Sequence, residues 1–337
     1  MPDTSLCSKR TGEIFLSNNR DTYSIMASLK ELGERELVRG IRSVIRQPPG
    51  LGPGDDSALI PPFGGDIVAC TDSITFERHF PKGMTYEEFG WMAAAVNISD
   101  LAAMGAVPVG LLAALTMPPD LDALSLYGIM SGMDECAGSF GAYIYGGDTK
   151  FGGGAVSCTA IGSLEGRRPM LRSGARPGDI VAVTGSLGSA AAGFFAVERG
   201  LDQVDLSSLF TPVPRVAEGA VLSASGAVTS CIDLSDGLAE GARSICSASR
   251  VGMDIHMAFL PEGEGVEAVA SETSISKEEM MLYWGGDYEL LFTFDKHKKE
   301  TLYEHDVDFS VIGMVTNDGA PYINYFDRRE AMGNGRH

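Results

Sequence analysis

The sequence is short of positive charge. Its 337 residues include 26 lysines and arginines against 45 aspartates and glutamates, so the formal net charge at pH 7 is −19. A field of this sign repels nucleic-acid backbones and anionic membrane surfaces. We therefore expect neither nucleic acid nor a membrane as a partner. A phosphate-bearing substrate would need divalent cations to offset the aspartates that it meets.

Paired cysteines and long apolar runs are absent too. The six cysteines stand singly without a CxxC pair, which argues against a zinc site and against a dense disulfide framework. No apolar run reaches the roughly 20 residues that span a bilayer, and the first 25 residues lack the apolar region of a signal peptide. We therefore expect a cytoplasmic protein in which residues 1–27 form a disordered leader.

Standard nucleotide-binding signatures are also absent. The sequence holds no GxxxxGK[ST] loop, and no GxGxxG motif joins a strand pattern to a helix pattern. Any chemistry on phosphates must therefore use a fold other than the P-loop and dinucleotide-binding folds.

What is present indicates a folded protein of about two domains. Hydrophobic residues make up 44% of the chain and charged residues 21%, which excludes a disordered chain. The segment 165–179 is rich in turn-forming residues, so we place a domain boundary at residue 166, between domains 28–165 and 166–330.

Hydrophobic periodicity predicts an α/β protein with layered helices and strands. In the first half, helices are predicted over 28–47, 85–104 and 121–139, and strands over 57–60, 66–71, 142–145 and 155–164. In the second half, the predicted strands are 180–184, 228–232, 288–294 and 309–315, and the predicted helices are 189–199, 214–225, 238–249 and 296–304.

Aspartates are the candidate metal-binding residues of this sequence. They occur at predicted strand or helix ends, most of them beside glycine, serine or threonine. Mg²⁺ prefers oxygen ligands and commonly binds through a few carboxylates together with substrate phosphates. Each segment alone is also a common turn or helix cap, and this reading stays open for any single one. The five segments are GDDSA (54–58), TDS (71–73), NISDL (97–101), GGDT (146–149) and DLSDG (233–237).

Asp72 and Asp100 are the hardest of these to explain as caps. Asp72 is expected to end an apolar strand, and Asp100 lies inside an apolar helix pattern, one turn after Asn97 on the same face. A buried, unpaired carboxylate is costly. A bound cation is therefore the economical explanation for both.

Together these segments resemble the thiamine-monophosphate kinase family, within the superfamily of aminoimidazole-ribonucleotide synthetase. The resemblance covers residues 28–326 in family order. The matching segments are GPGDDSAL (52–59), CTDSITFERHF (70–80), AVNISDLAAMGAVP (95–108), GGDT (146–149), LRSGARPGD (171–179), DLSDGL (233–238) and GGDYELLFT (285–293).

The resemblance implies transfer of the γ-phosphoryl group of ATP to thiamine monophosphate, with several Mg²⁺ ions as cofactors. It implies a two-domain, synthetase-like α/β fold and a homodimer whose N-terminal sheets pair into a barrel. Domain 28–165 would bind metal and nucleotide and form the dimer, and domain 166–330 would be the C-terminal α/β domain. No catalytic acid or base is expected, since positioning and metal ions would supply the acceleration.

Site residues also follow from the resemblance, matched position by position. It implies ATP contacts at Gly147, Asp148, Arg172 and Ser235, and substrate contacts at His79 and Phe326. The sequence departs from the family at Gly286, where the family usually has a glutamate near the substrate. The implied metal ligands are Asp56, Thr71, Asp72, Asp100, Asp148, Asp233 and Asp236.

Two alternatives remain beside the kinase. One is another ATP-dependent synthetase of the same superfamily, and the other is a nucleotide-binding maturation protein without turnover. Formation of ADP that depends on thiamine monophosphate separates the kinase from both.

Overall fold

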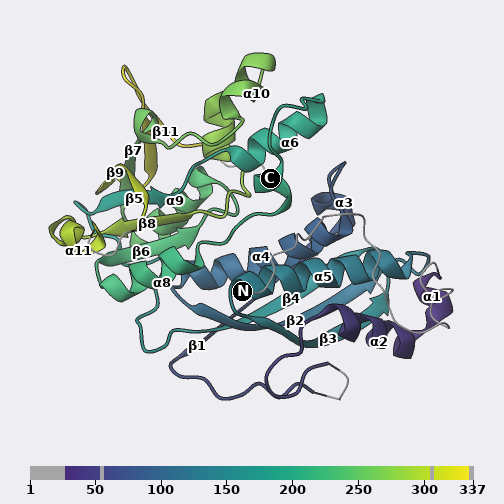
Figure 1. Cartoon of the computed structure of the whole chain (residues 1–337). Coiled ribbons are helices and arrows are strands. Elements are labelled where there is room, and N and C mark those ends of the chain that lie inside the picture. The colour runs from purple at the N-terminus through teal and green to yellow at the C-terminus, as the bar shows by residue number, and fades with distance from the viewer. Residues whose placement is uncertain (1–26, 54–56, 304–306, 334–337) are drawn as a thin grey trace, which may run out of the picture.

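Two β-sheets, each with its own helices, make up the computed structural model, which describes residues 27–53, 57–303 and 307–333 (Figure 1). The first sheet has four strands in the order β1-β4-β2-β3. Its strands are β1 (Ile67–Thr75), β2 (Val107–Met117), β3 (Tyr143–Phe151) and β4 (Ala155–Ser163). The helices of this part are α1 (Leu29–Leu32), α2 (Glu34–Val44), α3 (Phe76–His79), α4 (Tyr86–Ala103) and α5 (Ala123–Ser139).

The second sheet has seven strands in the order β11-β10-β7-β9-β5-β8-β6. They are β5 (Ile180–Thr184), β6 (Val228–Asp233), β7 (Gly252–His256), β8 (Leu290–Phe294), β9 (Phe309–Thr316), β10 (Pro321–Asn324) and β11 (Arg329–Ala331). The α-helices are α6 (Ser189–Arg199), α7 (Ser207–Phe210), α8 (Val216–Ser225), α9 (Leu238–Ser249), α10 (Val266–Glu272) and α11 (Lys299–Tyr303). Shorter helical turns are η1 (Met257–Phe259), η2 (Glu279–Tyr283) and η3 (Lys296–Lys298).

Helix α4 lies between the two sheets (Figure 1). A capping box starts it, because the Thr85 hydroxyl accepts from the Glu88 N–H and the Glu88 carboxylate accepts from the Thr85 N–H. Small residues let α4 and α5 pack closely, since a Cβ at Gly90 would collide with the Ile129 carbonyl. The helix is buried along almost its whole length, so its few polar side chains must find partners or ligands.

Several hydrogen bonds join α4 to the second part of the chain. The Trp91 indole N–H donates to the Pro212 carbonyl at 2.8 Å, and the Met170 N–H donates to the Met104 carbonyl at 3.1 Å. The first sheet ends at Ser163 and the second begins at Ile180, on either side of the predicted boundary at residue 166. The division into two domains itself stays a prediction.

The face of the first sheet that points away from α4 and α5 is open in the single chain. The register pairs Thr71 with Thr159 and Ser73 with Ser157 on this face, and Ile67 at its edge is 68% exposed. Helices α4 and α5 cover the opposite face, as Figure 1 shows. A sheet with one apolar, helix-covered face and one open face commonly packs a second layer on the open side.

The mixed α/β fold class is confirmed, but several predicted elements differ. The predicted helix over 28–47 is divided into α1 and α2 at Gly33, whose φ of +74° lies in the left-handed region. The predicted strand 57–60 is only a single bridge between Leu51 and Leu59. Strand β1 runs past Asp72 to Thr75, so Asp72 does not end it. Strands β2, β7, β10 and β11 were not predicted.

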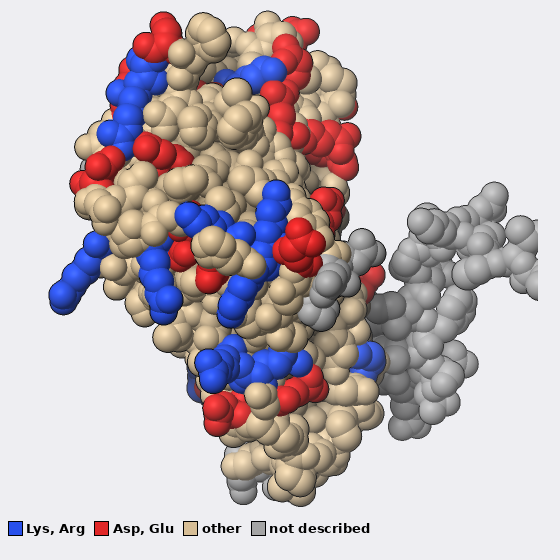
Figure 2. Space-filling view, turned by 90° about the vertical axis from the view of Figure 1, so that its left-hand side faces the viewer, with Lys and Arg blue, Asp and Glu red and all other residues tan. Residues whose placement is uncertain are grey.

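Charge is mixed on the face of the molecule that Figure 2 shows. Lysine and arginine side chains lie there among aspartate and glutamate side chains. The negative net charge is therefore not a uniform field over the surface. Among the helices of the described residues, none combines the length and apolar character needed to cross a membrane.

Candidate active site

A cleft of about 780 Å³ lies between the two parts of the chain and gathers half of the predicted site residues. Residues of β1, α3 and α4 line one side, and residues of α6, the β6–α9 turn and the segment 284–288 line the other. Six predicted residues meet here, and they come from four separate segments. They are Asp72, His79, Asp100, Asp233, Ser235 and Asp236.

Asn97 fixes the N-terminal side of the cleft. This fully buried amide on α4 accepts from the Asp72 N–H at 2.9 Å and donates to the Ala93 carbonyl at 3.0 Å. It thereby holds β1 against α4. Asp100 follows Asn97 by one turn on the same face, as the sequence predicts, and its carboxyl group lies next to that of Asp72.

Asp233 comes from the other side, at the end of β6. It is only 4% exposed, and one of its carboxylate oxygens accepts from the Ser99 hydroxyl at 2.8 Å. Gly237 closes the turn after it, with φ of +88° and a backbone so close that a Cβ would lie 2.6 Å from the Trp284 carbonyl oxygen. Only glycine fits this position without strain. The turn therefore holds Ser235 and Asp236 at the cleft.

The carboxyl groups raise one another's pKa. Burial, then the charges of Asp233 and Asp72, raise the pKa of Asp100 to about 7. Burial raises the pKa of Asp233 to about 6, although the Ser99 hydrogen bond and the Arg172 charge oppose this rise. A bound cation would relieve the same repulsion and desolvation.

The donor set suits Mg²⁺ in chemistry, but it is not a closed cage. Among residues 27–53, 57–303 and 307–333, no three acidic, histidine or cysteine side chains are grouped tightly enough to hold a metal ion by themselves. Asp72 is exposed, so the expectation that it is a buried, unpaired carboxylate was wrong. Asp233 is buried and Asp100 is half-buried, so the cost of an unpaired buried carboxylate applies to Asp233 and in part to Asp100. Mg²⁺ usually completes its shell with water and substrate phosphates, so an open set of carboxylates still fits it.

Gly147 and Asp148 lie away from this cleft. They line a second hollow of about 1090 Å³ beside β3, together with parts of the segment 52–60. Asp148 pairs with Lys150 at 2.9 Å. The register runs from Asp148 through Ala114 and Ser157 to Ser73, which is three strand spacings or about 14 Å. One chain therefore does not bring Asp148 to the side of Asp72.

Four other predicted residues have different placements. Thr71 points to the open face of the sheet, where its hydroxyl donates to the Cys158 carbonyl at 3.0 Å, so its side chain lies away from Asp72. Arg172 is exposed but close enough for its charge to lower the pKa of Asp233. Phe326 is fully exposed between β10 and β11 and does not line the cleft. Asp56 lies outside the described residues.

His79 offers a neutral imidazole to the cleft. Its Nδ1 accepts from the Thr75 N–H at 3.1 Å, and burial lowers its pKa from the ordinary value. Near neutral pH the ring is therefore uncharged and carries its proton on Nε2. Such a ring can donate one hydrogen bond to an anionic group without a charge of its own.

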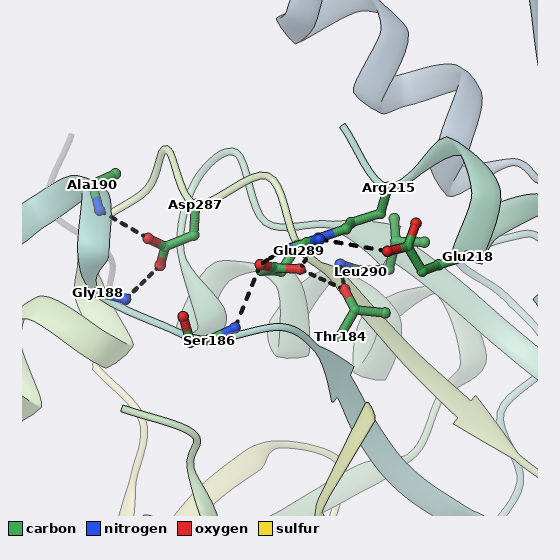
Figure 3. Close-up of polar contacts among 9 residues, drawn as sticks. All are labelled: Thr184, Ser186, Gly188, Ala190, Arg215, Glu218, Asp287, Glu289 and Leu290. Atoms are coloured by element: carbon green, nitrogen blue, oxygen red, sulfur yellow. Dashed lines mark hydrogen bonds and ion pairs between the residues drawn. The ribbon is translucent and has the colours of Figure 1, made fainter. Parts of the chain in front are cut away.

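Sequence reasoning missed a polar cluster behind the cleft (Figure 3). Glu289 is buried and accepts two hydrogen bonds of 2.6 Å from the Arg215 guanidinium and one of 2.7 Å from the Thr184 hydroxyl. Asp287 accepts from the Gly188 and Ala190 N–H groups at the start of α6. Such charge-assisted bonds are strong and fix geometry. The acidic residues of GGDYELLF are thus anchors.

Tyr288 lies between these two anchors and faces the aspartates. Its φ of +51° is unusual for a bulky residue and costs about 1–3 kcal/mol unless its surroundings impose it. Burial and the charges of Asp233 and Asp72 raise the pKa of its hydroxyl. The anchors at 287 and 289 therefore hold the segment 284–288 as one wall of the cleft.

Comparison with protein families agrees with this fold. The model for the AIR synthase related protein N-terminal domain matches residues 54–164, and that for the C-terminal domain matches residues 176–325. The chain belongs to this family of AIR synthase related proteins.

Individual relatives narrow the assignment. The thiamine-monophosphate kinase of Methanospirillum hungatei is 36% identical over 273 residues, which cover 80% of this chain and 89% of that protein. The structure of thiamine-monophosphate kinase from Stenotrophomonas maltophilia is 29% identical, with a TM-score of 0.75 over 86% of this chain and 95% of that one. AaThiL complexed with AMPPCP and TMP is 25% identical, with a TM-score of 0.71 over 92% and 99%. Within the larger family, the chain belongs to the thiamine-monophosphate kinases.

Proposed function

We propose that the protein transfers the γ-phosphoryl group of ATP to the phosphate of thiamine monophosphate. One observation carries this proposal: Asp72, Asp100, Asp233 and Asp236, from three segments of the chain, line one cleft together with Ser235 and His79. The kinase names of the relatives and the AMPPCP and TMP bound by AaThiL support the same donor and acceptor.

The transfer needs little covalent chemistry from the chain. An oxygen of the acceptor phosphate bonds to the γ-phosphorus, the bond from that phosphorus to the β-phosphate oxygen breaks, and ADP leaves with the electron pair. The acceptor oxygen is already largely ionised near neutral pH, so no general base is required. The chain's part would be to hold both phosphates in line, and we propose that His79, which lines the cleft, donates its Nε2–H to the acceptor.

Mg²⁺ is the proposed cofactor, held by Asp72, Asp100, Asp233 and Asp236. It would offset the charge of the two polyanionic substrates. Arg172 lies near Asp233 and is proposed to add a guanidinium contact to ATP. The roles of Asp56, Thr71 and Phe326 stay predictions, and so does the cytoplasmic location.

We also propose that the active unit is a homodimer. The open face of the first sheet needs a cover, and a second copy of the same sheet would supply one in a closed barrel. Gly147 and Asp148 belong to the far edge strand, so pairing edges would bring them toward the β1 edge of the partner. The separation of about 14 Å within one chain is the observation that favours this arrangement.

The test is the formation of ADP and thiamine diphosphate from ATP and thiamine monophosphate, followed by mass spectrometry of the product. We expect turnover only with Mg²⁺ and only with the acceptor present. If the rate of ATP turnover is unchanged by thiamine monophosphate but rises with another phosphorylated compound, the protein is a different synthetase. Binding of ATP without any turnover would point to a maturation protein.

A further inference from the structure

One wall of the cleft is aromatic. The rings of Phe194 and Trp284 lie 4.7 Å apart between centroids at an interplanar angle of 34°, and both line the cleft. Phe195 supports the indole edge-on, with a centroid distance of 4.8 Å and an interplanar angle of 68°. The indole is thus held in a fixed orientation by two neighbouring rings.

The same wall carries a carboxylate. Ala190, Phe194 and Glu198 follow one another at four-residue spacing along α6, and all three line the cleft. Glu198 is exposed, and within the part of the chain that the structure describes, no hydrogen bond or ion pair engages it. A negative charge therefore stands one helical turn from the Phe194 ring, on the same side of the cleft.

The wall is also fixed before any ligand binds. The segment 284–288 is anchored by Asp287 to the start of α6 and by Glu289 to Arg215 (Figure 3). A Cβ at Gly285 would collide with the Ser235 carbonyl, so the segment lies directly on the β6–α9 turn. A binding surface that is ordered in advance loses less entropy when its ligand binds.

We propose that Trp284, Phe194 and Glu198 bind the cationic ring of the acceptor and determine its specificity. This inference rests on the proposed function. The thiazolium ring of thiamine monophosphate carries a permanent positive charge, which aromatic faces and a carboxylate attract. This chain has Gly286 where the family that it resembles usually has a glutamate. Glu198 on α6 would supply a carboxylate instead.

Steady-state kinetics with thiamine monophosphate, at saturating ATP and Mg²⁺, test the proposal. We expect Trp284→Leu to raise KM about tenfold with kcat little changed, and Trp284→Phe to restore most of the affinity because it keeps an aromatic face. Glu198→Gln should raise KM several-fold. The matched control is Glu264→Gln, which removes an exposed carboxylate that does not line the cleft and should leave KM unchanged.

A second acceptor isolates the role of charge. The phosphate ester of hydroxyethylthiazole has a neutral ring, so its KM should be equal in the wild type and in Glu198→Gln. Wild-type KM for thiamine monophosphate in both Glu198→Gln and Trp284→Leu, with wild-type turnover intact, would overturn the inference alone. Since Glu198 is exposed, its variant stays informative even if Trp284→Leu fails to fold. Absence of turnover in the wild type would instead overturn the proposed function, and this inference with it.

Discussion

The Ser99 hydroxyl on α4 donates a 2.8 Å hydrogen bond to the Asp233 carboxylate at the end of β6. Both side chains are buried, and they belong to the two different sheet systems of the chain. The bond therefore sets the position of one proposed metal ligand relative to the helix that carries another, Asp100.

Loss of this bond should cost stability. Ser99→Ala leaves the buried Asp233 carboxylate without its hydroxyl partner, so we expect the free energy of unfolding to fall by about 1–3 kcal/mol. Urea unfolding of the metal-free protein measures the loss. Ser139→Ala is the control, because its exposed hydroxyl bonds to the Glu135 carbonyl in the same helix. Equal stability of the two variants would contradict the prediction.

Removal of one carboxylate charge should stop turnover but leave the fold intact. Asp72 is exposed, so Asp72→Asn should unfold like the wild type, while kcat falls by about a thousandfold as metal-assisted charge stabilisation is lost. Thermal unfolding and ADP formation at increasing Mg²⁺ are the measurements. Asp202→Asn, a matched change at an exposed aspartate outside the cleft, should behave like the wild type. Turnover near the wild-type rate in Asp72→Asn would refute the assignment.

The pH dependence of stability should change with Mg²⁺. The folded-state pKa values of about 7 for Asp100 and about 6 for Asp233 exceed the unfolded value near 3.8. The folded state thus binds these protons more tightly, and their contribution is complete below pH 3.8 and is lost as pH rises to about 7. Mg²⁺ should therefore raise the melting temperature more at pH 8 than at pH 5.5. An equal rise at both pH values, by thermal scanning, would contradict this.

The ion pair between Arg215 and Glu289 should stabilise the folded protein. Arg215→Met leaves a buried carboxylate without its guanidinium partner, so we expect a loss of about 3 kcal/mol in the free energy of unfolding. Arg39→Met removes an exposed pair with Glu36 and should cost less than about 0.5 kcal/mol. Denaturant titration of both proteins gives the comparison, and a loss at Arg215 no larger than at Arg39 would show that the pair is not an anchor.

Dimer formation should depend on the open face of the first sheet. Light scattering of the wild type is expected to give twice the chain mass of 35.7 kDa. Ile161→Arg places a charge on that face and should shift the protein to monomer and reduce turnover. Phe259→Arg, at an exposed apolar residue of the other part of the chain, serves as the control. A monomeric wild type would refute the dimer.

The cleft was partly predictable because its aspartates sit in patterns that local physics explains. An apolar helix with Asn97 and Asp100 one turn apart had to place both on one face, and the capping box fixed its start. Strand β2 was missed because VPVGLLAALTM is an almost continuous apolar run, and such a run does not distinguish a buried strand from a buried helix.

Long-range relations escaped prediction for a different reason. The order β1-β4-β2-β3 places Asp148 at the far edge from Asp72, and no local pattern encodes strand order. Arg215 and Glu289 are separated by 74 residues, and no pattern in the sequence indicates that they form a pair. Only the fold brings such partners together.

Gly286 limits which side chains the proposed acceptor wall can carry. Its φ of +93° suits glycine, and a Cβ there would lie 3.3 Å from the Ala190 Cβ, so a glutamate at this position would carry backbone strain of about 1–2 kcal/mol. A glutamate introduced by substitution at this position alone would therefore require the loop to change its backbone conformation. The neighbouring helix α6 can carry a carboxylate to this wall without such strain, since Glu198 already lines the cleft there.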